Sequence, residues 1–297
     1  MRAVRRVREE DPGFDALLFG PEGPVAWDDL PDDLHAVWGG AVERDEDAGG
    51  IAGRSIERAA RAALAGDVHA VLTAPIHKPS LHAAGWRVPG HTEMLQGLSD
   101  VPAVGMLMAA ERTRLGAPLR VLLATTHVAL RDVPRLLTER LLLEQIGLLA
   151  GGLRRDWGIV EPRIAMCGVN PHASDGGLFG DEEDRIVVPA LGRLRADGVA
   201  VEGPLPADTV FQRALGGAFD AVVAPYHDVG MAAFKTVCFG TGVNVTLGLP
   251  FVRTSPDHGT AFDLAGTGRA DAGSMEEALR LAVRLARGRF DRGGADA

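Results

Sequence analysis

The repeat of apolar positions is most regular between residues 52 and 74. Apolar side chains recur there at the three- and four-residue spacing of one helix face, at Ile56, Ala59, Ala60, Ala63 and Leu64. Gly66 follows at once and is typical of a helix end. The mostly apolar segment at residues 68–74 then predicts a short buried strand that leads into a proline-containing loop.

Further strands and helices alternate along the rest of the chain. Short apolar segments predict strands at residues 120–126, 163–169, 220–225 and 243–247. Helical spacing predicts helices over roughly residues 133–149 and 182–196. Ser274 and Glu277 have the spacing of a capping box, which predicts a last helix that ends near Arg287 with Gly288 as its stop. This alternation favours α/β layers around a largely parallel sheet.

Composition and charge narrow the choice of partners. The formal net charge is −9, so no basic excess is present to neutralise a nucleic-acid backbone and we expect no nucleic-acid partner. A local group of basic side chains can still bind a small anion. We find no apolar N-terminal segment and no apolar stretch of about 20 residues, and therefore expect a cytoplasmic protein without a membrane partner. Cys167 and Cys238 lie in apolar segments and are expected to be buried, reduced thiols.

Three histidines follow predicted strands: His127, His172 and His227. Ligands bind at the carboxyl ends of parallel strands, so these side chains are candidates for one convergent site. Neutral imidazoles are common ligands of zinc and other divalent transition ions, and three of them leave positions open for a substrate. Asp228 is expected to orient the His227 ring. Each histidine taken singly is more typical of a capping or core residue, and only the three together bring the metal interpretation level with that one, so the residues alone leave both interpretations open.

Basic and amide side chains lie in the apolar segment at residues 235–253. Arg253 closes the run LGLPFVR, and a guanidinium in such surroundings needs an anionic partner such as a phosphate or a carboxylate. Lys235 and Asn244 lie in the same segment. The glycine fingerprint GxGxxG is absent, so this test alone predicts no nucleotide cofactor.

Seven segments, read in order, resemble one family of enzymes. They are TAPIHKPSLHAAG, PGHTEML, ATTHVALRDV, GVNPHASDGGLFGDEE, GPLPADTVF, APYHDVGMAAFK and GVNVTLGLPFVRTSPDHGTAFDLAGTGRAD. Between about residues 55 and 285 the chain resembles the 4-hydroxythreonine-4-phosphate dehydrogenase family of vitamin B6 synthesis. The resemblance implies the layered α/β/α fold of the isocitrate and isopropylmalate dehydrogenases, which bind NAD without the glycine fingerprint. Residues 1–297 would then form one dehydrogenase unit of two interleaved subdomains, with the site in the cleft between them.

The resemblance also implies roles for single residues. The metal ligands would be His127, His172 and His227, which together with Lys235 are the expected catalytic residues. The expected substrate-binding residues are His91, Thr92, Lys235, Asn244 and Arg253. The expected cofactor-binding residues lie in DHGTAFDLAGTGRAD at residues 257–271 and are Asp257, His258, Gly259, Thr260 and Asp263.

The implied reaction oxidises a small phosphorylated hydroxy acid with NAD, or with NADP, and needs one divalent metal ion per site, such as Zn, Mg, Mn or Co. The product would be a 3-keto acid that loses CO2 and leaves an aminoketone phosphate. The family completes its site across a homodimer interface, which implies that one histidine ligand comes from the partner chain. A His127 variant and a His227 variant are therefore expected to complement each other in mixed dimers.

Some positions depart from the pattern of the family. The family usually begins with a strand and a Gly-Asp-Pro-x-Gly-Ile-Gly-Pro-Glu loop, whereas EEDPGFD at residues 9–15 lacks these glycines, so one N-terminal βα unit is expected to be missing. His77 stands where members often carry Asn, and Val229 where many carry Gln. These changes leave three alternatives: a threonate or erythronate 4-phosphate dehydrogenase, a non-catalytic sugar-phosphate binding protein, and a metal-dependent hydrolase or aldolase.

Overall fold

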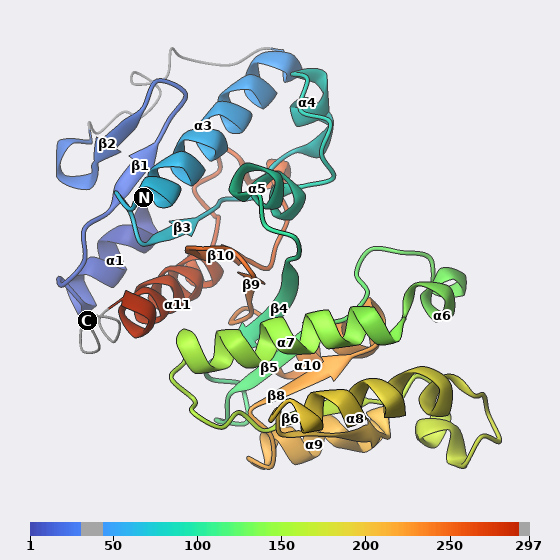
Figure 1. Cartoon of the computed structure of the whole chain (residues 1–297). Helices are drawn as coiled ribbons and strands as arrows, with labels where there is room; N and C mark the ends of the chain where they lie inside the picture. The colour runs from blue at the N-terminus through green and yellow to red at the C-terminus, as the bar shows by residue number, and fades with distance from the viewer. Residues whose placement is uncertain (31–43, 291–297) are drawn as a thin grey trace. The chain divides into compact units, whose positions relative to one another are not determined.

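The computed structural model describes residues 1–30 and 44–290, which fold into two compact units (Figure 1). Unit 1 consists of Met1–Pro102 and Leu249–Ala286, and unit 2 consists of Ala103–Gly248 with the residues from Arg287 onward. Each unit is thus built from two separate stretches of the chain. The prediction of a missing βα unit near the N-terminus stays a prediction.

Unit 1 contains a pair of parallel strands with helices around it. Its elements are α1 (Arg2–Glu10), β1 (Leu17–Phe19), β2 (Pro24–Ala26), α3 (Asp45–Ala65), β3 (Ala70–Leu72), α4 (Lys78–Ala83), α5 (His91–Ser99), β10 (Val252–Pro256) and α11 (Gly273–Phe290), the last of which ends in unit 2. β1 and β2 form an antiparallel hairpin. β3 and β10 pair in parallel, with Val71 opposite Arg253, so two distant parts of the chain share one edge of a sheet.

The helix predicted from the apolar repeat is α3. Ile56, Ala59, Ala60 and Ala63 are buried as the spacing predicts. Gly66 ends the helix in the left-handed conformation (φ 84°), which glycine adopts without the penalty of a Cβ atom. The strand predicted next is confirmed as the shorter β3.

Unit 2 is a layered α/β/α structure. Its strands are β4 (Gly105–Ala110), β5 (Leu119–Leu123), β6 (Ile164–Cys167), β7 (Val201–Leu205), β8 (Ala221–Ala224) and β9 (Val243–Leu247), and they lie in the order β9-β4-β5-β8-β6-β7. β5, β8, β6 and β7 run parallel to one another, while β4 is antiparallel to both β5 and β9. The predicted largely parallel sheet is therefore confirmed, with β4 as its reversed strand.

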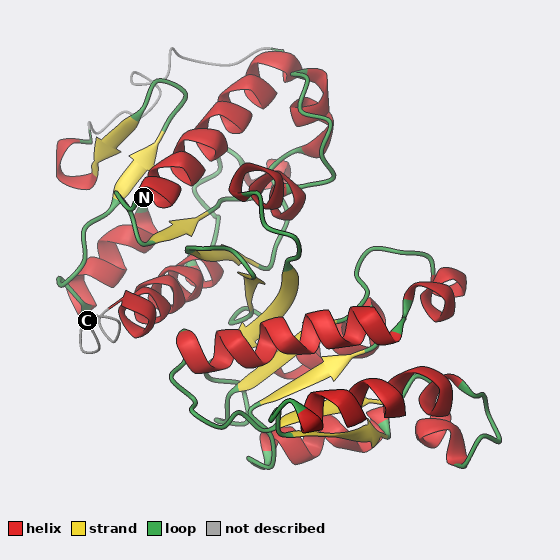
Figure 2. Ribbon diagram, viewed as in Figure 1, coloured by secondary structure: helices red, strands yellow, loops and turns green. Residues whose placement is uncertain are grey.

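Helices cover both faces of this sheet (Figure 2). The covering helices are α7 (Glu139–Arg155), α8 (Val188–Ala196), α9 (Ala207–Leu215) and α10 (His227–Cys238), and the short α6 (Val133–Leu136) precedes α7. α9 and α10 contribute Phe211 and Phe234 to the apolar cluster that contains Val121 and Leu123 of β5. Gly230 permits this close packing, since a Cβ atom at that position would lie 2.5 Å from Leu123 Cδ2. β5 pairs with β8 with Leu123 opposite Ala224, so the two strands end side by side and set the position of the loops that follow.

Two predicted helices differ from the structure in detail. The helix expected over residues 133–149 is split into α6 and α7, because Thr138 accepts a hydrogen bond from the Leu141 amide and starts a new helix. The capping box at Ser274 is wrong, since α11 already begins at Gly273 and runs through Gly288 to Phe290. The Gly273 amide donates to Asp271 Oδ1 instead.

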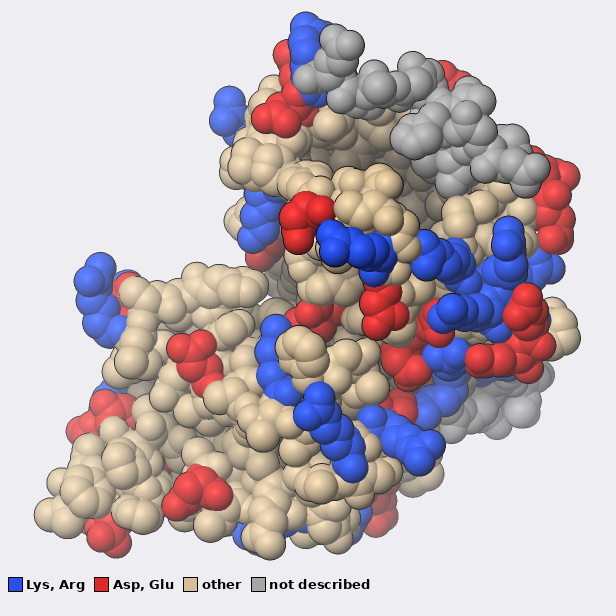
Figure 3. Space-filling view, turned by 180° about the vertical axis from the view of Figure 1, so that it is seen from behind, with Lys and Arg blue, Asp and Glu red and all other residues tan. Residues whose placement is uncertain are grey.

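Two other features bear on earlier expectations. Cys167 and Cys238 are free and buried, as predicted, and burial raises the pKa of each thiol to about 12. Among residues 1–30 and 44–290, none of the helices combines the length and the apolar character that crossing a membrane requires. Acidic and basic side chains are interspersed on the face shown in Figure 3.

Candidate active site

A small pocket of about 130 Å³ lies in unit 2 where β5 and β8 end. It is lined by Thr126, His127, Val128, Leu130, Val133, Tyr226, His227 and Asp228. The two strands are parallel neighbours, and their pairing continues past their ends because the Thr125 hydroxyl donates to the Pro225 carbonyl at 2.8 Å. The loops that carry the two histidines therefore leave the sheet side by side.

His127 and His227 lie next to each other in this pocket. Their ring centroids are 5.4 Å apart, with an angle of 44° between the ring planes. His227 is the first residue of α10, and its Nδ1 lies 2.7 Å from Asp228 Oδ1. A carboxylate at Nδ1 fixes the tautomer and leaves Nε2 available as a ligand. The predicted contact of Asp228 with His227 is confirmed, and the arrangement suits two of the ligands of a divalent ion.

His172 lies in the same unit, on the loop after β6. It is exposed and has a left-handed backbone conformation, with φ 54°. In the part of the chain that the structure describes, no three His, Cys, Asp or Glu side chains are close enough to hold a metal ion. A single chain thus brings together two of the three predicted ligands. The expected complementation between His127 and His227 variants is wrong, because these two rings lie side by side in one chain.

A positively charged group of side chains lies in unit 1. Arg253, on β10, is only 2% exposed, and its Nη2 donates to Thr73 Oγ1 at 2.7 Å. His91 and Thr92 start helix α5 and are half-buried. The charges of Arg253 and Lys78 both act on His91. Since a helix N-terminus also attracts negative charge, this region of unit 1 suits an anion.

Burial and charge set the protonation of these groups. Burial, together with the charges of Arg253 and then Lys78, lowers the pKa of His91 to about 3. Burial lowers the pKa of Arg253 to about 10, although the neighbouring Glu93 carboxylate acts in the opposite direction. At neutral pH, His91 is therefore a neutral imidazole, and Arg253 supplies the positive charge.

Two further predicted substrate residues belong to unit 2. Lys235 is an exposed residue of α10. Asn244 lies on β9 opposite Met108. Its Oδ1 atom is buried and has no hydrogen-bond partner among the described residues. A buried amide oxygen without a partner is costly, so a donor on a bound ligand would stabilise it.

The predicted cofactor residues lie on the loop between β10 and α11 in unit 1. Asp257 is anchored there, because its amide donates to Ser274 Oγ at 3.3 Å. His258, Gly259, Thr260 and Asp263 follow on the loop, and all but the half-buried Thr260 are exposed. Phe262 is 64% exposed and meets the His77 ring edge to face, with 5.2 Å between the ring centroids. The loop thus contacts the segment TAPIHKPS after β3.

Comparisons with known proteins decide the family. A sequence profile described as "Pyridoxal phosphate biosynthetic protein PdxA" matches residues 32–282. The chain belongs to this family. A curated PdxA relative, named 4-hydroxythreonine-4-phosphate dehydrogenase, from Geobacter metallireducens, is 50% identical over 241 residues, which are 81% of this chain and 69% of the relative.

Solved structures of relatives share the fold. A 4-hydroxythreonine-4-phosphate dehydrogenase from Klebsiella pneumoniae has a TM-score of 0.75 and 47% identity, and the match covers 82% of this chain and 73% of that one. A terephthalate 1,2-cis-dihydrodiol dehydrogenase from Burkholderia xenovorans LB400 has a TM-score of 0.64 and 30% identity, over 85% of this chain and 77% of that one. The predicted layered α/β/α fold is thereby confirmed.

The sequence interpretation missed several residues of this PdxA chain that border the predicted ones. Lys78 acts on His91, and Tyr226 lines the histidine pocket. Thr73 contacts Arg253 from the neighbouring strand. All three lie within motifs that the sequence already singles out, Thr73 and Lys78 in TAPIHKPS and Tyr226 in YHDVG, so their place in these segments after strands was the available signal.

Proposed function

We propose that this chain is an NAD-dependent, metal-dependent 4-hydroxythreonine-4-phosphate dehydrogenase, an oxidoreductase of pyridoxine synthesis. The observation that carries the proposal is the His127–His227 pair with Asp228 at the ends of β5 and β8, in a chain 50% identical to a curated enzyme of that name. The C3 hydroxyl of the substrate would become a ketone, with hydride transferred to NAD and the proton released. The resulting 3-keto acid would lose CO2 and give an aminoketone phosphate.

The residues of the histidine pocket fit a divalent ion such as Zn, Mg, Mn or Co. His127 and His227 would hold it. The Asp228 carboxylate contacts Nδ1 of His227 and would thereby leave Nε2 free to bind the ion. When bound, the ion polarises the substrate oxygen. We propose that the third ligand is His172 of the partner subunit in a homodimer, since one chain assembles no group of three among its described residues.

The substrate's phosphate or carboxylate would bind the cationic group of unit 1. Arg253 offers the guanidinium fork that suits such anions, and neutral His91 can donate or accept one hydrogen bond beside it. Thr92, Lys235 and Asn244 are the further substrate residues in this proposal. The unpartnered Oδ1 of Asn244 supports its role, because a hydroxyl or ammonium group of the substrate could donate to it.

The loop that begins at Asp257 is the proposed site for NAD or NADP. It includes His258, Gly259, Thr260 and Asp263, and its predominantly exposed side chains are accessible to a ligand. We also propose a cytoplasmic location, since two free thiols are typical of a reducing compartment.

The purified chain, supplied with NAD and each of the four metal ions, tests the proposal. We expect NADH to form with 4-hydroxythreonine 4-phosphate faster than with threonate 4-phosphate or erythronate 4-phosphate, and chelation of the metal to stop it. A preference for either alternative acid would change the substrate. No NADH with any acid would favour the non-catalytic binding protein or the hydrolase and aldolase alternatives.

A substitution at Arg253 tests the anion site separately. Arg253→Lys keeps the charge but loses the fork, so we expect kcat/KM to fall by the equivalent of about 1.5–3 kcal/mol. The matched control is Arg58→Lys at an exposed position of α3, which should leave kcat/KM unchanged. Equal values for the two variants would remove Arg253 from the proposed site.

A further inference from the structure

The loop that carries His172 has an unusual backbone. His172, Ala173, Ser174 and Asp175 all have positive φ values, of 54°, 54°, 68° and 47°. Residues with a Cβ atom rarely adopt this conformation even singly, so four in a row require strong support from their surroundings. The loop also folds back tightly, because a Cβ atom at Gly168 would lie 2.7 Å from Ala173 Cα.

A buried carboxylate supplies this support. Glu183 is 1% exposed, and its Oε1 accepts hydrogen bonds from the backbone amides of Val169 and Asn170, each at 2.7 Å. Its Oε2 accepts a third bond from the Asn170 side chain at 2.9 Å. The two residues that precede Pro171 and His172 are thus held by both oxygens of one side chain. We call Glu183 and Asn170 the loop clamp.

Glu183 lies at the start of an unusual helical turn from which its side chain reaches the loop. Glu183 opens a π-helical turn, Glu183–Val187, before α8 begins. Such turns are rare and are frequently found at functional sites. A buried carboxylate is costly to desolvate and is retained where its hydrogen bonds are needed. The three hydrogen bonds of the Glu183 side chain go to Val169 and Asn170 of this loop, and the Asn170 side chain also donates to Glu182 Oε2 at 2.8 Å.

We infer that Glu183 is a positioning residue for the metal site, which holds the loop of His172 in its left-handed conformation so that the imidazole is presented to the ion. The inference rests on the proposed function, because it takes His172 to be a metal ligand. Glu183 would not itself bind the ion, because its side chain is bonded to the backbone amides of Val169 and Asn170 and to the Asn170 side chain, and it would act on His172 through them.

The variant Glu183→Gln tests the loop clamp. Its carbonyl oxygen can still accept from the Val169 and Asn170 amides, but its NH2 group replaces Oε2 and meets the Asn170 Nδ2 donor, and the carboxylate charge is lost, so the hold on the loop should weaken. In the full-length protein freed of metal and titrated with Co²⁺, we expect about 10–100-fold weaker binding, the usual effect of losing a group that orients a metal ligand. Hydrogen exchange of the Val169 and Asn170 amides should become faster in the metal-free protein. A purely structural carboxylate would lower the melting temperature without changing Co²⁺ affinity.

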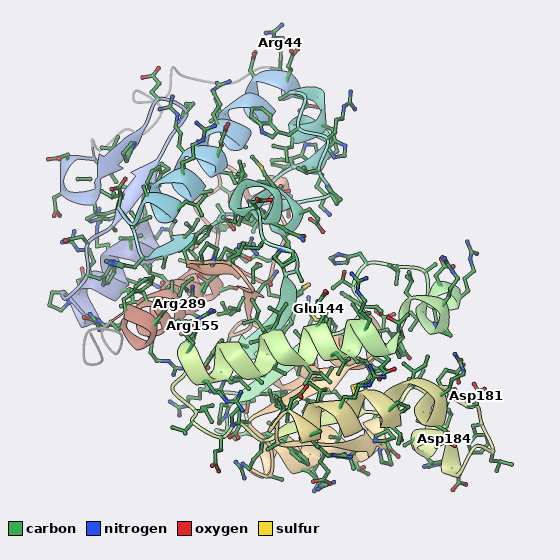
Figure 4. All side chains as sticks on the ribbon, viewed as in Figure 1. Arg44, Glu144, Arg155, Asp181, Asp184 and Arg289 are labelled. Atoms are coloured by element: carbon green, nitrogen blue, oxygen red, sulfur yellow. The ribbon has the colours of Figure 1, made fainter. Side chains whose placement is uncertain are left out.

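Three further variants separate the outcomes. Asp184→Asn makes the same change at the exposed neighbour (Figure 4) and should bind Co²⁺ like the wild type. His172→Ala should bind it at least as weakly as Glu183→Gln. If Glu183→Gln does not fold, Asn170→Ala removes only the side-chain part of the clamp and should weaken binding less, in the same direction.

Each contrary result has one meaning. If His172→Ala binds Co²⁺ weakly but Glu183→Gln binds it normally, the inference is overturned and the proposed function stays intact. If Glu183→Gln does not fold, normal affinity in Asn170→Ala has the same meaning. Normal affinity in His172→Ala overturns the proposed metal ligand, and the inference with it.

Discussion

At the scale of single residues, the structure shows why Arg253 and His91 belong together. The sequence already predicts that an arginine in the apolar run LGLPFVR needs an anionic partner, and Arg253 is indeed buried. The sequence could not show that the His91 ring is neutral. Its pKa of about 3 depends on burial and on the charges of Arg253 and Lys78, and Arg253 is brought near only by the fold. The charge in this region therefore comes from the arginine rather than from the histidine.

The pKa of His91 leads to a prediction about stability. Its value in the folded chain, about 3, is below the ordinary 6.5, so the unfolded chain binds more protons between these values. The contribution of His91 to the free energy of unfolding is therefore complete above pH 6.5 and is lost as the pH falls toward 3. For a half-buried ring, the loss should stay below about 1.4 kcal/mol per pH unit.

The measurement is urea unfolding of the wild type and His91→Asn at several pH values between 4 and 8. The difference between the two curves should change below pH 6.5 and stay constant above it. His258→Asn is the matched control, because His258 is exposed. Parallel curves for the wild type and His91→Asn over the whole range would show that the ring titrates normally.

At the scale of secondary structure, the long apolar repeats are predictable and the ends of elements are not. The spacing of Ile56, Ala59, Ala60 and Ala63 is enough to place α3, since one buried face decides it. The capping box at Ser274 fails because the Ser274 hydroxyl accepts a bond from Asp257, which only the folded chain brings near. Competition of this kind between local and distant partners is invisible in sequence.

The candidate site, too, could be predicted from the sequence only in part. Motif order indicates His127, His172 and His227, but the sequence leaves open which of them share a chain, because their separations along the chain carry no geometric information. The parallel pairing of β5 with β8 decides it for His127 and His227. The left-handed run at His172 is not predictable from the sequence, since His and Asp adopt this conformation as occasional single residues and Ala and Ser seldom adopt it.

Helix α1 provides a prediction at this scale. Val7 is 2% exposed, whereas Arg280 of α11, which pairs with Glu10 of α1 at 2.8 Å, is partly exposed. Burial should outweigh the ion pair: we expect Val7→Ala to lower the free energy of unfolding by about 1–3 kcal/mol, because two buried methyl groups are lost. Arg280→Ala should cost less than about 1 kcal/mol, as exposed ion pairs do. Urea unfolding of both variants gives the ranking, and the reverse order would mean that charge, not burial, attaches α1.

Unit 2 contains a buried carboxylate, Asp156, that is paired with two arginines. Asp156 is 3% exposed and is bound by both Arg155 and Arg289 (Figure 4). These two guanidinium groups hold the pKa of its carboxyl below the ordinary range, despite burial, which alone would raise it. A buried carboxylate with two such partners stays ionised at neutral pH.

At the scale of the whole molecule, the proposed sharing of the metal site between two chains predicts a specific pattern of complementation. A dimer of one His172→Ala chain and one His227→Ala chain keeps one complete set of His127, His227 and His172, so activity should return. With random exchange of subunits, about a quarter of the wild-type activity is expected, because half of the dimers are mixed and one of their two sites is intact.

The control mixture joins His127→Ala with His227→Ala. It should remain inactive, because His127 and His227 come from the same chain and every site then lacks one of them. NADH formation after verified subunit exchange is the readout. Activity in the control mixture, or none in the first mixture, would contradict the proposed division of ligands between the chains.

The discontinuous make-up of unit 1 has a consequence for the order in which the protein is assembled on the ribosome. The hydrogen bond between Thr73 and Arg253 joins residues 180 positions apart, and β3 must wait for β10 to be synthesised before the two can pair. The main stretch of unit 2, Ala103–Gly248, is complete before that moment. Since domains tend to fold as they emerge, unit 2 can form first, with its histidine pocket already in place. The anion site around Arg253 can close only afterwards, and a nascent chain that stalls before β10 already holds the His127–His227 pair but still lacks Arg253.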